Sequence, residues 1–184
     1  MTINPGQRFE LEMPFRLEEH GFVPQRDGDT GGNPYIQKNS IRRRLDHVAP
    51  LWSMSVPTLI TIQDDVVTMS ATLTIEGQTH GAIGTGIIQR LKRDGSPKPP
   101  FELGKEVTKA LKTAASDCFP RAAQYFGIGW YLRAIPPAWK DRVKTPQGLG
   151  EYLTLVKSAI DKAKGDGEKA AELLGNGSGE RRIR

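Results

Sequence analysis

The chain has 184 residues, with 26 lysines and arginines against 21 aspartates and glutamates, and a net charge of +5. This length suits one hydrophobic core with loose ends, and the basic balance favours polyanionic partners such as nucleic acid. The single cysteine, Cys118, excludes a disulfide within the chain, and no run approaches the ~18 apolar residues of a membrane span. Secretion and membrane insertion are therefore disfavoured, and we expect a cytoplasmic protein.

The two ends of the chain predict little regular structure. Residues 1–34 are rich in glycine, proline and charged side chains, which interrupt helices and strands alike, so an arm and a loop are expected there. Residues 140–174 predict a helical extension, with one amphipathic helix over 149–174. Residues 175–184 predict a flexible basic tail.

Residues 35–139 carry the patterns of a folded domain. Apolar residues at helical spacing predict a short helix after Tyr35, which Pro50 ends. A long apolar stripe after Gly104 predicts a second helix that packs on a sheet. The expected fold class is α+β: a short helix, a three-stranded antiparallel β-meander packed on a long helix, and flexible ends. The strands are expected over 59–62, 66–75 and 81–88.

Groupings that could carry catalysis are scarce. The three histidines are far apart in sequence, and no histidine or cysteine has metal-ligand spacing. Asp64 and Asp65 could bind a nuclease metal, but a turn between two strands is the more economical interpretation. Gly81, Gly84 and Gly86 lack the Lys-Ser/Thr of a phosphate loop, so they predict a strand that bends or approaches another backbone closely. We expect no enzymatic activity, no metal and no cofactor.

Basic side chains cluster in three places that could contact a polyanion. The predicted first helix carries basic residues on its flank, and the loop over 89–100 is basic and proline-rich. On the long helix, Lys105, Lys109 and Lys112 follow at i, i+4 and i+7, which aligns their ammonium groups on one face. Each cluster also fits an ordinary solvated surface, so charge alone does not decide the function.

A motif in the long helix gives a more specific signal. The segment from Lys109 to Leu132 reads KALKTAASDCFPRAAQYFGIGWYL. Its lysine-bearing turn, its aspartate, its basic residue and its closing Phe-Gly-x-Gly-x-Tyr-Leu resemble the recombination mediators named after the yeast Rad fifty-two protein, particularly their bacterial DdrA-type branch. Residues 35–48 with Trp52 are similar to that family's first helix and its entry into the first strand. The resemblance covers roughly residues 35–139.

The resemblance implies a function as well as a fold. Members of the family pack side by side into rings and hold single-stranded DNA in a basic outer groove, and they consume no nucleotide or metal. The implied protein binds single-stranded DNA and anneals complementary strands without ATP in recombinational DNA repair. It would be a homo-oligomer in the bacterial cytoplasm, associated with the nucleoid and encoded by a bacterium or a phage. Other recombination or single-strand-binding proteins are expected as further partners.

The family's groove residues can be carried over to this sequence. By the resemblance, Lys109, Lys112 and Arg121 face the groove. Pro120 and Gln124 stand where eukaryotic members usually carry basic side chains, and Pro120 also predicts a kink or a restart of the helix. The candidate DNA-binding residues are Lys38, Arg42 and Arg43 in the first helix, Arg90, Lys92 and Arg93 in the loop, and Lys105, Lys109, Lys112 and Arg121 in the long helix.

Several alternatives stay open at this point. The same fold could protect DNA ends or coat single strands without annealing them, or its basic face could bind acidic protein partners as an assembly factor. Asp117 and Arg121 also fit a simple i, i+4 ion pair. The aromatic residues that follow the long helix fit packing better than base stacking. These residues are Trp130, Tyr131 and Trp139.

Overall fold

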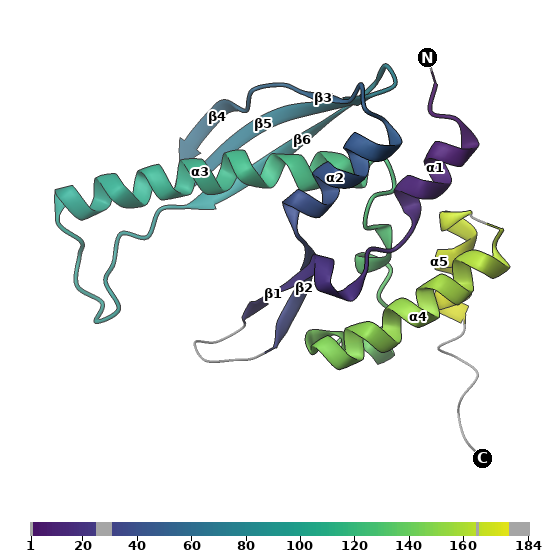
Figure 1. Ribbon diagram of the computed structural model, residues 1–184. Coiled ribbons are helices and arrows are strands. Elements are labelled where there is room, and N and C mark those ends of the chain that lie inside the picture. The colour runs from purple at the N-terminus through teal and green to yellow at the C-terminus, as the bar shows by residue number, and fades with distance from the viewer. Residues whose placement is uncertain (1, 25–30, 165, 177–184) are drawn as a thin grey trace. The chain divides into compact units, whose positions relative to one another are not determined.

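The computed structural model describes residues 2–24, 31–164 and 166–176 (Figure 1). These residues form two compact units. The first consists mainly of Leu51–Tyr125, and the second of the described residues of Ile3–Pro50 and Phe126–Arg184. The units do not divide at the predicted boundaries after residues 34 and 139. The assignment of a DNA-binding domain to residues 35–139 stays a prediction. None of the described helices is long and apolar enough to cross a membrane.

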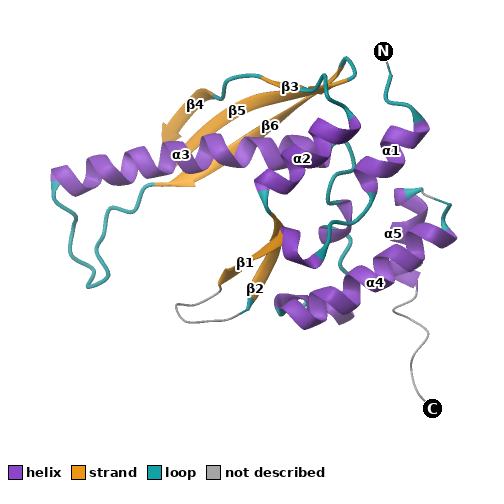
Figure 2. Cartoon of the chain, viewed as in Figure 1, coloured by secondary structure: helices purple, strands orange, loops and turns teal. Residues whose placement is uncertain are grey.

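The first unit is an antiparallel sheet with a long helix on one face, which confirms the predicted fold class. Strand β5 (Val66–Ile75) is central. Strand β6 (Gln78–Ile87) pairs along its whole length on one side, while β4 (Thr58–Gln63) and the short β3 (Ser53–Met54) pair on the other. The predicted meander is therefore present, with β3 as an additional strand (Figure 2).

Tight turns join the three long strands. Asp64 and Asp65 connect β4 to β5 and both have positive φ, 48° and 64°. Glu76 and Gly77 connect β5 to β6 in the same way, with φ of 48° and 78°. Two consecutive residues with positive φ are typical of hairpin turns that match the twist of the strands. The Asp64–Asp65 pair is therefore a turn, as the economical interpretation predicted.

Helix α3 (Pro100–Gln124) packs against β5 and β6 through its apolar stripe. Ala110, Ala114 and Cys118 are buried along this stripe, as predicted. The helix begins at Pro100 and not near Gly104, because proline is well suited to the first helical position.

The expected restart at Pro120 is wrong, because α3 continues through this residue to Gln124. Proline removes only the N–H that would bond the Ser116 carbonyl. The neighbouring side chains Phe119, Ala122 and Ala123 are buried. Their packing holds the last turn in helical geometry despite the missing hydrogen bond.

The glycines of β6 allow α3 to approach the sheet closely. A Cβ atom on Gly84 would overlap the carbonyl oxygen of Ala114, and one on Gly86 would overlap that of Ala110. The predicted close approach to another backbone is therefore confirmed, and the partner is the buried face of α3. A β-strand with side chains at these two positions could not pack in this way.

The second unit contains regular elements where an arm and a loop were expected over residues 1–34, so that prediction is wrong. Asn4 caps the first helix through a reciprocal pair of hydrogen bonds with Gln7. Leu11 and Phe15 are buried, so tertiary packing offsets the weak local signal of a polar, glycine-rich segment. The elements here are α1 (Pro5–Glu12), η1 (Leu17–Glu19), the antiparallel hairpin of β1 (His20–Pro24) and β2 (Gly32–Ile36), and α2 (Lys38–Val48).

The C-terminal half of this unit is also helical. The single helix expected over 149–174 is instead two helices, because the first ends at a cap on Ala163 and Lys164 has a φ of +54°. The predicted tail over 175–184 lies mostly outside the described residues. The elements are the short helices η2 (Trp130–Leu132), η3 (Pro137–Trp139) and η4 (Arg142–Lys144), then α4 (Pro146–Lys162) and α5 (Gly167–Asn176).

Tyr131 is the centre of the second unit's core. Its hydroxyl accepts a hydrogen bond from the Phe15 amide (3.2 Å) and lies 2.9 Å from Nε2 of His20. Its carbonyl accepts a bond from the Tyr152 hydroxyl (2.8 Å). The neighbouring Trp130 indole donates to the Glu12 carbonyl (2.9 Å). The aromatic segment after α3 is therefore packing, as predicted.

We expect the close approach of α3 to be sensitive to one methyl group. Gly84→Ala and Gly86→Ala should each lower the free energy of unfolding by about 1–3 kcal/mol, the usual cost of overpacking. Gly81→Ala on the same strand is the control, because its Cβ would meet Thr72 Cγ2 at an ordinary 3.8 Å. Chemical denaturation of the three variants measures the difference, and equal stabilities would contradict the packing described above.

Burial of His20 should make stability depend on pH. Its Nδ1 lies 2.8 Å from the Arg16 carbonyl, and desolvation lowers the pKa of this histidine below its usual 6.5. The unfolded chain then binds the proton more readily, so His20 stabilises the fold above about pH 6.5 and loses this contribution as pH falls. His20→Gln should be less stable at pH 7.5 and lose less stability on acidification to pH 5, as thermal unfolding would record. An unchanged pH dependence in the variant would contradict this role.

Candidate nucleic-acid interface

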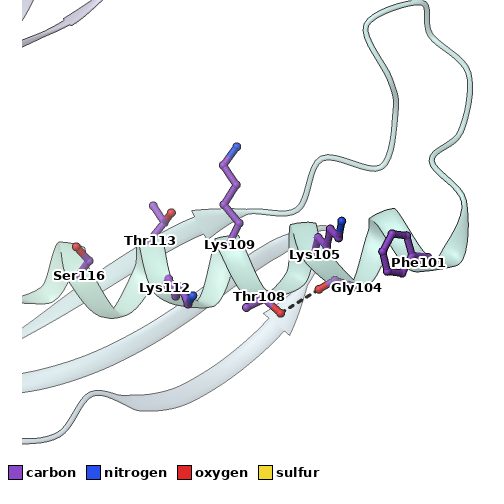
Figure 3. Close-up of a pocket in the computed structure, with 8 residues that line it drawn as sticks. All are labelled: Phe101, Gly104, Lys105, Thr108, Lys109, Lys112, Thr113 and Ser116. Carbon is purple, nitrogen blue, oxygen red and sulfur yellow. Dashed lines mark hydrogen bonds between the residues drawn. The ribbon is translucent and has the colours of Figure 1, made fainter.

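Three lysines lie along the side of α3 that faces away from the sheet. Lys105, Lys109 and Lys112 are all exposed, and at about 100° per residue their mean direction is opposite the buried stripe. Lys109 and Lys112 have no ion-pair partner within the described part of the chain. The Lys105 ammonium lies 4.2 Å from the centre of the Phe101 ring. Figure 3 shows the three side chains on one helix, with Lys109 extending away from the ribbon.

The same side of α3 forms a shallow hollow without a carboxylate in its lining, which we call the lysine face. Hydroxyl groups stand between its ammonium groups, and the Thr108 hydroxyl donates to the Gly104 carbonyl at 3.0 Å (Figure 3). Cations alternating with hydroxyls suit the oxygens of a phosphate backbone. The lysine face consists of Phe101, Gly104, Lys105, Thr108, Lys109, Lys112, Thr113 and Ser116.

Glu106 directly follows Lys105 of the lysine face in sequence, and a partner already neutralises it. The Lys98 ammonium donates to its carboxylate at 2.7 Å, and both side chains are largely buried. This hydrogen bond holds the pKa of Glu106 below its usual value. Lys98 is therefore a structural cation that fastens the loop before α3 to the helix.

Arg121 does not lie with the lysines. It follows Lys112 by nine positions, which places it about 180° around the helix. Its guanidinium donates to the Asp117 carboxylate at 2.6 Å, so the predicted i, i+4 ion pair is confirmed. The grouping of Lys109, Lys112 and Arg121 that the resemblance implied therefore does not form on this helix.

The predicted cations of the first helix lie in the second unit. Lys38, Arg42 and Arg43 are exposed on α2. Arg44 instead points inward: its guanidinium lies 3.4 Å from the centre of the Phe15 ring and donates to backbone carbonyls, and burial lowers its pKa. Three arginines in a row thus divide into two exposed side chains and one structural one.

The loop between β6 and α3 is exposed and basic, as predicted. It is held by a backbone bond from Lys92 to the Ser96 carbonyl (2.8 Å), while the Asp94 carboxylate accepts from the Ser96 amide (2.9 Å). Lys92 and Arg93 are exposed at its tip. Arg90 is bound to the Asp65 carboxylate, so its charge is partly compensated.

The sequence interpretation missed a second basic surface, which lies in the second unit. Arg133 and Lys140 are exposed there and have no ion-pair partner among the described residues. Lys144 donates to Asp141 at 2.7 Å and lowers the pKa of that carboxyl. The run Trp-Lys-Asp-Arg-Val-Lys contains three basic residues that could have indicated this surface, but the sequence pattern predicted only a helical extension there. These basic side chains line a pocket on the second basic surface. The lining residues are Asn33, Pro34, Leu132, Arg133, Ile135, Pro137, Lys140, Asp141, Val143 and Lys144.

The residues that could carry other chemistry have structural surroundings. Cys118 is buried, and desolvation raises the pKa of its thiol, which disfavours the reactive thiolate. His80 stacks on Tyr125 with ring centres 5.4 Å apart. Within residues 2–24, 31–164 and 166–176, no group of three or more histidine, cysteine, aspartate or glutamate side chains could hold a metal ion.

Comparisons with known proteins find this chain similar to two single-stranded DNA-binding proteins. The chain is 32% identical over 116 residues to the single-stranded DNA-binding protein DdrA of Deinococcus deserti, covering 61% of this chain and 48% of the relative. It is 31% identical over 108 residues to the protein of the same name from Deinococcus radiodurans, covering 58% and 43%. The chain thus spans about half the length of the curated relatives it matches. No protein-family model and no solved structure matches the sequence. The two matches show that part of this chain is similar to the DdrA single-stranded DNA-binding proteins.

Proposed function

We propose that this protein binds single-stranded DNA through the phosphate backbone, on the lysine face of α3. The observation that carries the proposal is the row of three exposed lysines opposite the buried stripe, in a hollow whose lining contains no carboxylate. The similarity to the DdrA single-stranded DNA-binding proteins supports the choice of ligand. Contacts to phosphates carry no sequence information, so binding is expected at every sequence alike.

We further propose that copies of the chain assemble into a ring and anneal complementary strands without ATP, in recombinational DNA repair at the bacterial nucleoid. Each copy offers a few phosphate contacts, and an oligomer joins them into strong binding through multivalency. The resemblance of the long helix to that of the Rad fifty-two mediators is the reason for proposing a ring and strand annealing. Within the first unit, the exposed Lys92 and Arg93 of the loop would then extend the DNA path beyond α3.

The aromatic residues that follow α3 are engaged in packing, which favours annealing over coating by base stacking. A protein that stacks bases on aromatic rings hinders their pairing. Here Trp130 and Tyr131 are engaged in the core of the second unit, and Trp139 packs on Tyr152 with ring centres 5.7 Å apart. The lining of the lysine face includes one aromatic ring, Phe101, which is 73% exposed and has the Lys105 ammonium 4.2 Å from its centre. A single ring at one end of the lysine face leaves the other bases of a bound strand free to meet a complementary strand.

Neutralising two lysines of the lysine face should weaken DNA binding and its salt dependence. Each phosphate of a single strand that a lysine neutralises contributes about −0.7 to the slope of log K against log salt, because counterions are released, so Lys109→Gln with Lys112→Gln should make the slope shallower by about 1.4. Fluorescence anisotropy with oligonucleotides of several compositions, across a salt series, measures both effects.

A matched control removes the same charge elsewhere. Lys157 and Lys162 are exposed on α4, and Lys157→Gln with Lys162→Gln should leave the slope unchanged. Equal slopes for both double variants would show that the lysine face is not the binding surface. A loss confined to one base composition would contradict contact through the backbone.

Annealing is tested separately from binding. With two complementary labelled oligonucleotides, the wild-type protein should speed duplex formation, with no added nucleotide or metal, and the Lys109→Gln, Lys112→Gln protein should do so less. Strong binding without acceleration would leave a protein that coats or protects single strands, and the annealing activity would then be rejected.

A further inference from the structure

The sheet of the first unit is almost free of charge. Charged residues make up 26% of the whole chain. Between Thr58 and Ile87 they are confined to the two hairpin turns, as Asp64, Asp65 and Glu76. The strands themselves carry threonine, serine, glutamine, glycine and apolar side chains, and His80 on β6 is their one titratable residue. A surface without cations offers a phosphate backbone no charged partner, and depletion of charge is the mark of the buried core of a protein–protein interface.

Both outer edges of this sheet are open among the described residues. Strand β4 pairs only with β5 on one side, and β6 pairs only with β5 on the other. Helix α3 covers β5 and β6, so all six residues of β4 are exposed. Leu59, Ile60 and Ile62 are 47%, 54% and 48% exposed. An apolar edge strand with free backbone groups is a template for pairing with another chain.

The usual protection of an edge strand is weak here. Proteins block free edges with lysines, prolines, bulges or a covering segment. Strand β4 has one bulge, between Leu59 and Thr61, and no charged residue or proline within its bounds. Strand β6 likewise has no lysine or proline, and Ile83 and Ile87 remain exposed on it. The two edges therefore have the same character, at opposite sides of one sheet.

We propose that the β4 edge of one copy pairs with the β6 edge of a second copy of this chain. Strands β4 and β6 are both antiparallel to β5, so they run in the same direction and would join as a parallel pair. Each chain offers one edge of each kind, so the contact is head-to-tail and repeats from copy to copy. Such heterologous contacts produce closed rings when the rotation closes.

This inference rests on the proposed function, because it assumes that the chain forms an oligomer. It also explains how the oligomer would serve DNA binding. Edge-to-edge pairing continues one sheet, so the α3 helices of all copies lie on the same face of it. Three strands at about 4.8 Å give a spacing of about 14 Å between successive helices, which exceeds the 8–10 Å of helices in contact. The lysine faces then stand side by side, and no copy covers the lysines of the next.

A lysine placed on the β4 edge tests the interface. Ile62→Lys should shift the assembled wild-type protein to single copies, measured without DNA by size-exclusion chromatography with light scattering. Leu155→Lys on α4 is the control, because Leu155 is similarly exposed, at 40%, and this variant should keep the wild-type mass. Circular dichroism verifies that both variants are folded. A wild-type protein that is monomeric, or a folded Ile62→Lys protein of wild-type mass, would overturn the interface.

Engineered disulfides test the direction of pairing. The native Cys118 is buried, so new surface cysteines report without background. Thr61→Cys is combined in one chain with a cysteine at Ile83, Thr85 or Ile87, to cover neighbouring registers. Within one chain the two strands are about 9.6 Å apart, beyond the reach of a disulfide. Oxidation should give a ladder of covalent multimers from a double variant and none from Thr61→Cys alone.

The outcomes separate this inference from the proposed function. Dimers from Thr61→Cys alone would mean a symmetric β4–β4 contact and overturn the head-to-tail interface. A ladder from a protein that does not retain DNA would support the interface and reject the proposed function. Salt-dependent DNA binding by a monomer would support DNA binding and overturn the interface.

Discussion

The candidate interface depends on the close contact between α3 and β6. At Gly84 and Gly86 the strand has no side chain, and the carbonyl oxygens of Ala114 and Ala110 occupy the space that a Cβ would need. This contact fixes which face of the helix is buried. Because an α-helix has a single rotational phase, fixing the buried face also fixes the direction of Lys105, Lys109 and Lys112. Two glycines on a strand thus determine the position of three lysines that they do not touch.

The motif that carries the family resemblance has a structural explanation at most of its positions. Gly127 and Gly129 have φ of 82° and 74°, and side chains there would overlap Glu12 and Ile36. Tyr131 is a hydrogen-bonding centre of the core, and Asp117 pairs with Arg121. The motif therefore specifies how the chain leaves α3 and enters the second unit's core. The lysines of the lysine face do not lie in the second half of the motif, where most of these structural positions are. A match of the motif is therefore stronger evidence for the fold than for the ligand.

What the sequence could predict follows from how local each signal is. The stripe of α3 and the alternation of β5 are repeated over many residues, and hairpin turns need only two adjacent residues, so these elements were predicted correctly. The helix α1 and the hairpin of β1 and β2 were missed, because this region is held by contacts far along the chain, such as those of Phe15 and His20 with the Tyr131 hydroxyl. The directions of Arg44 and Arg121 were missed or misassigned for the same reason. Whether an arginine is exposed depends on a partner such as Phe15 that no local pattern reveals.

The distribution of charge separates two tasks on the first unit. The helix and the loop carry exposed cations, while the strands carry no lysine or arginine, although the chain as a whole is one quarter charged. A single lysine face, with its few ammonium groups, gives weak and salt-sensitive binding, because each contact contributes only one released counterion. Useful affinity therefore requires several copies on one strand, and the uncharged sheet offers a way to align them. A sheet edge bearing lysines would protect the monomer from association, but it would remove the multivalency that the proposed DNA binding requires.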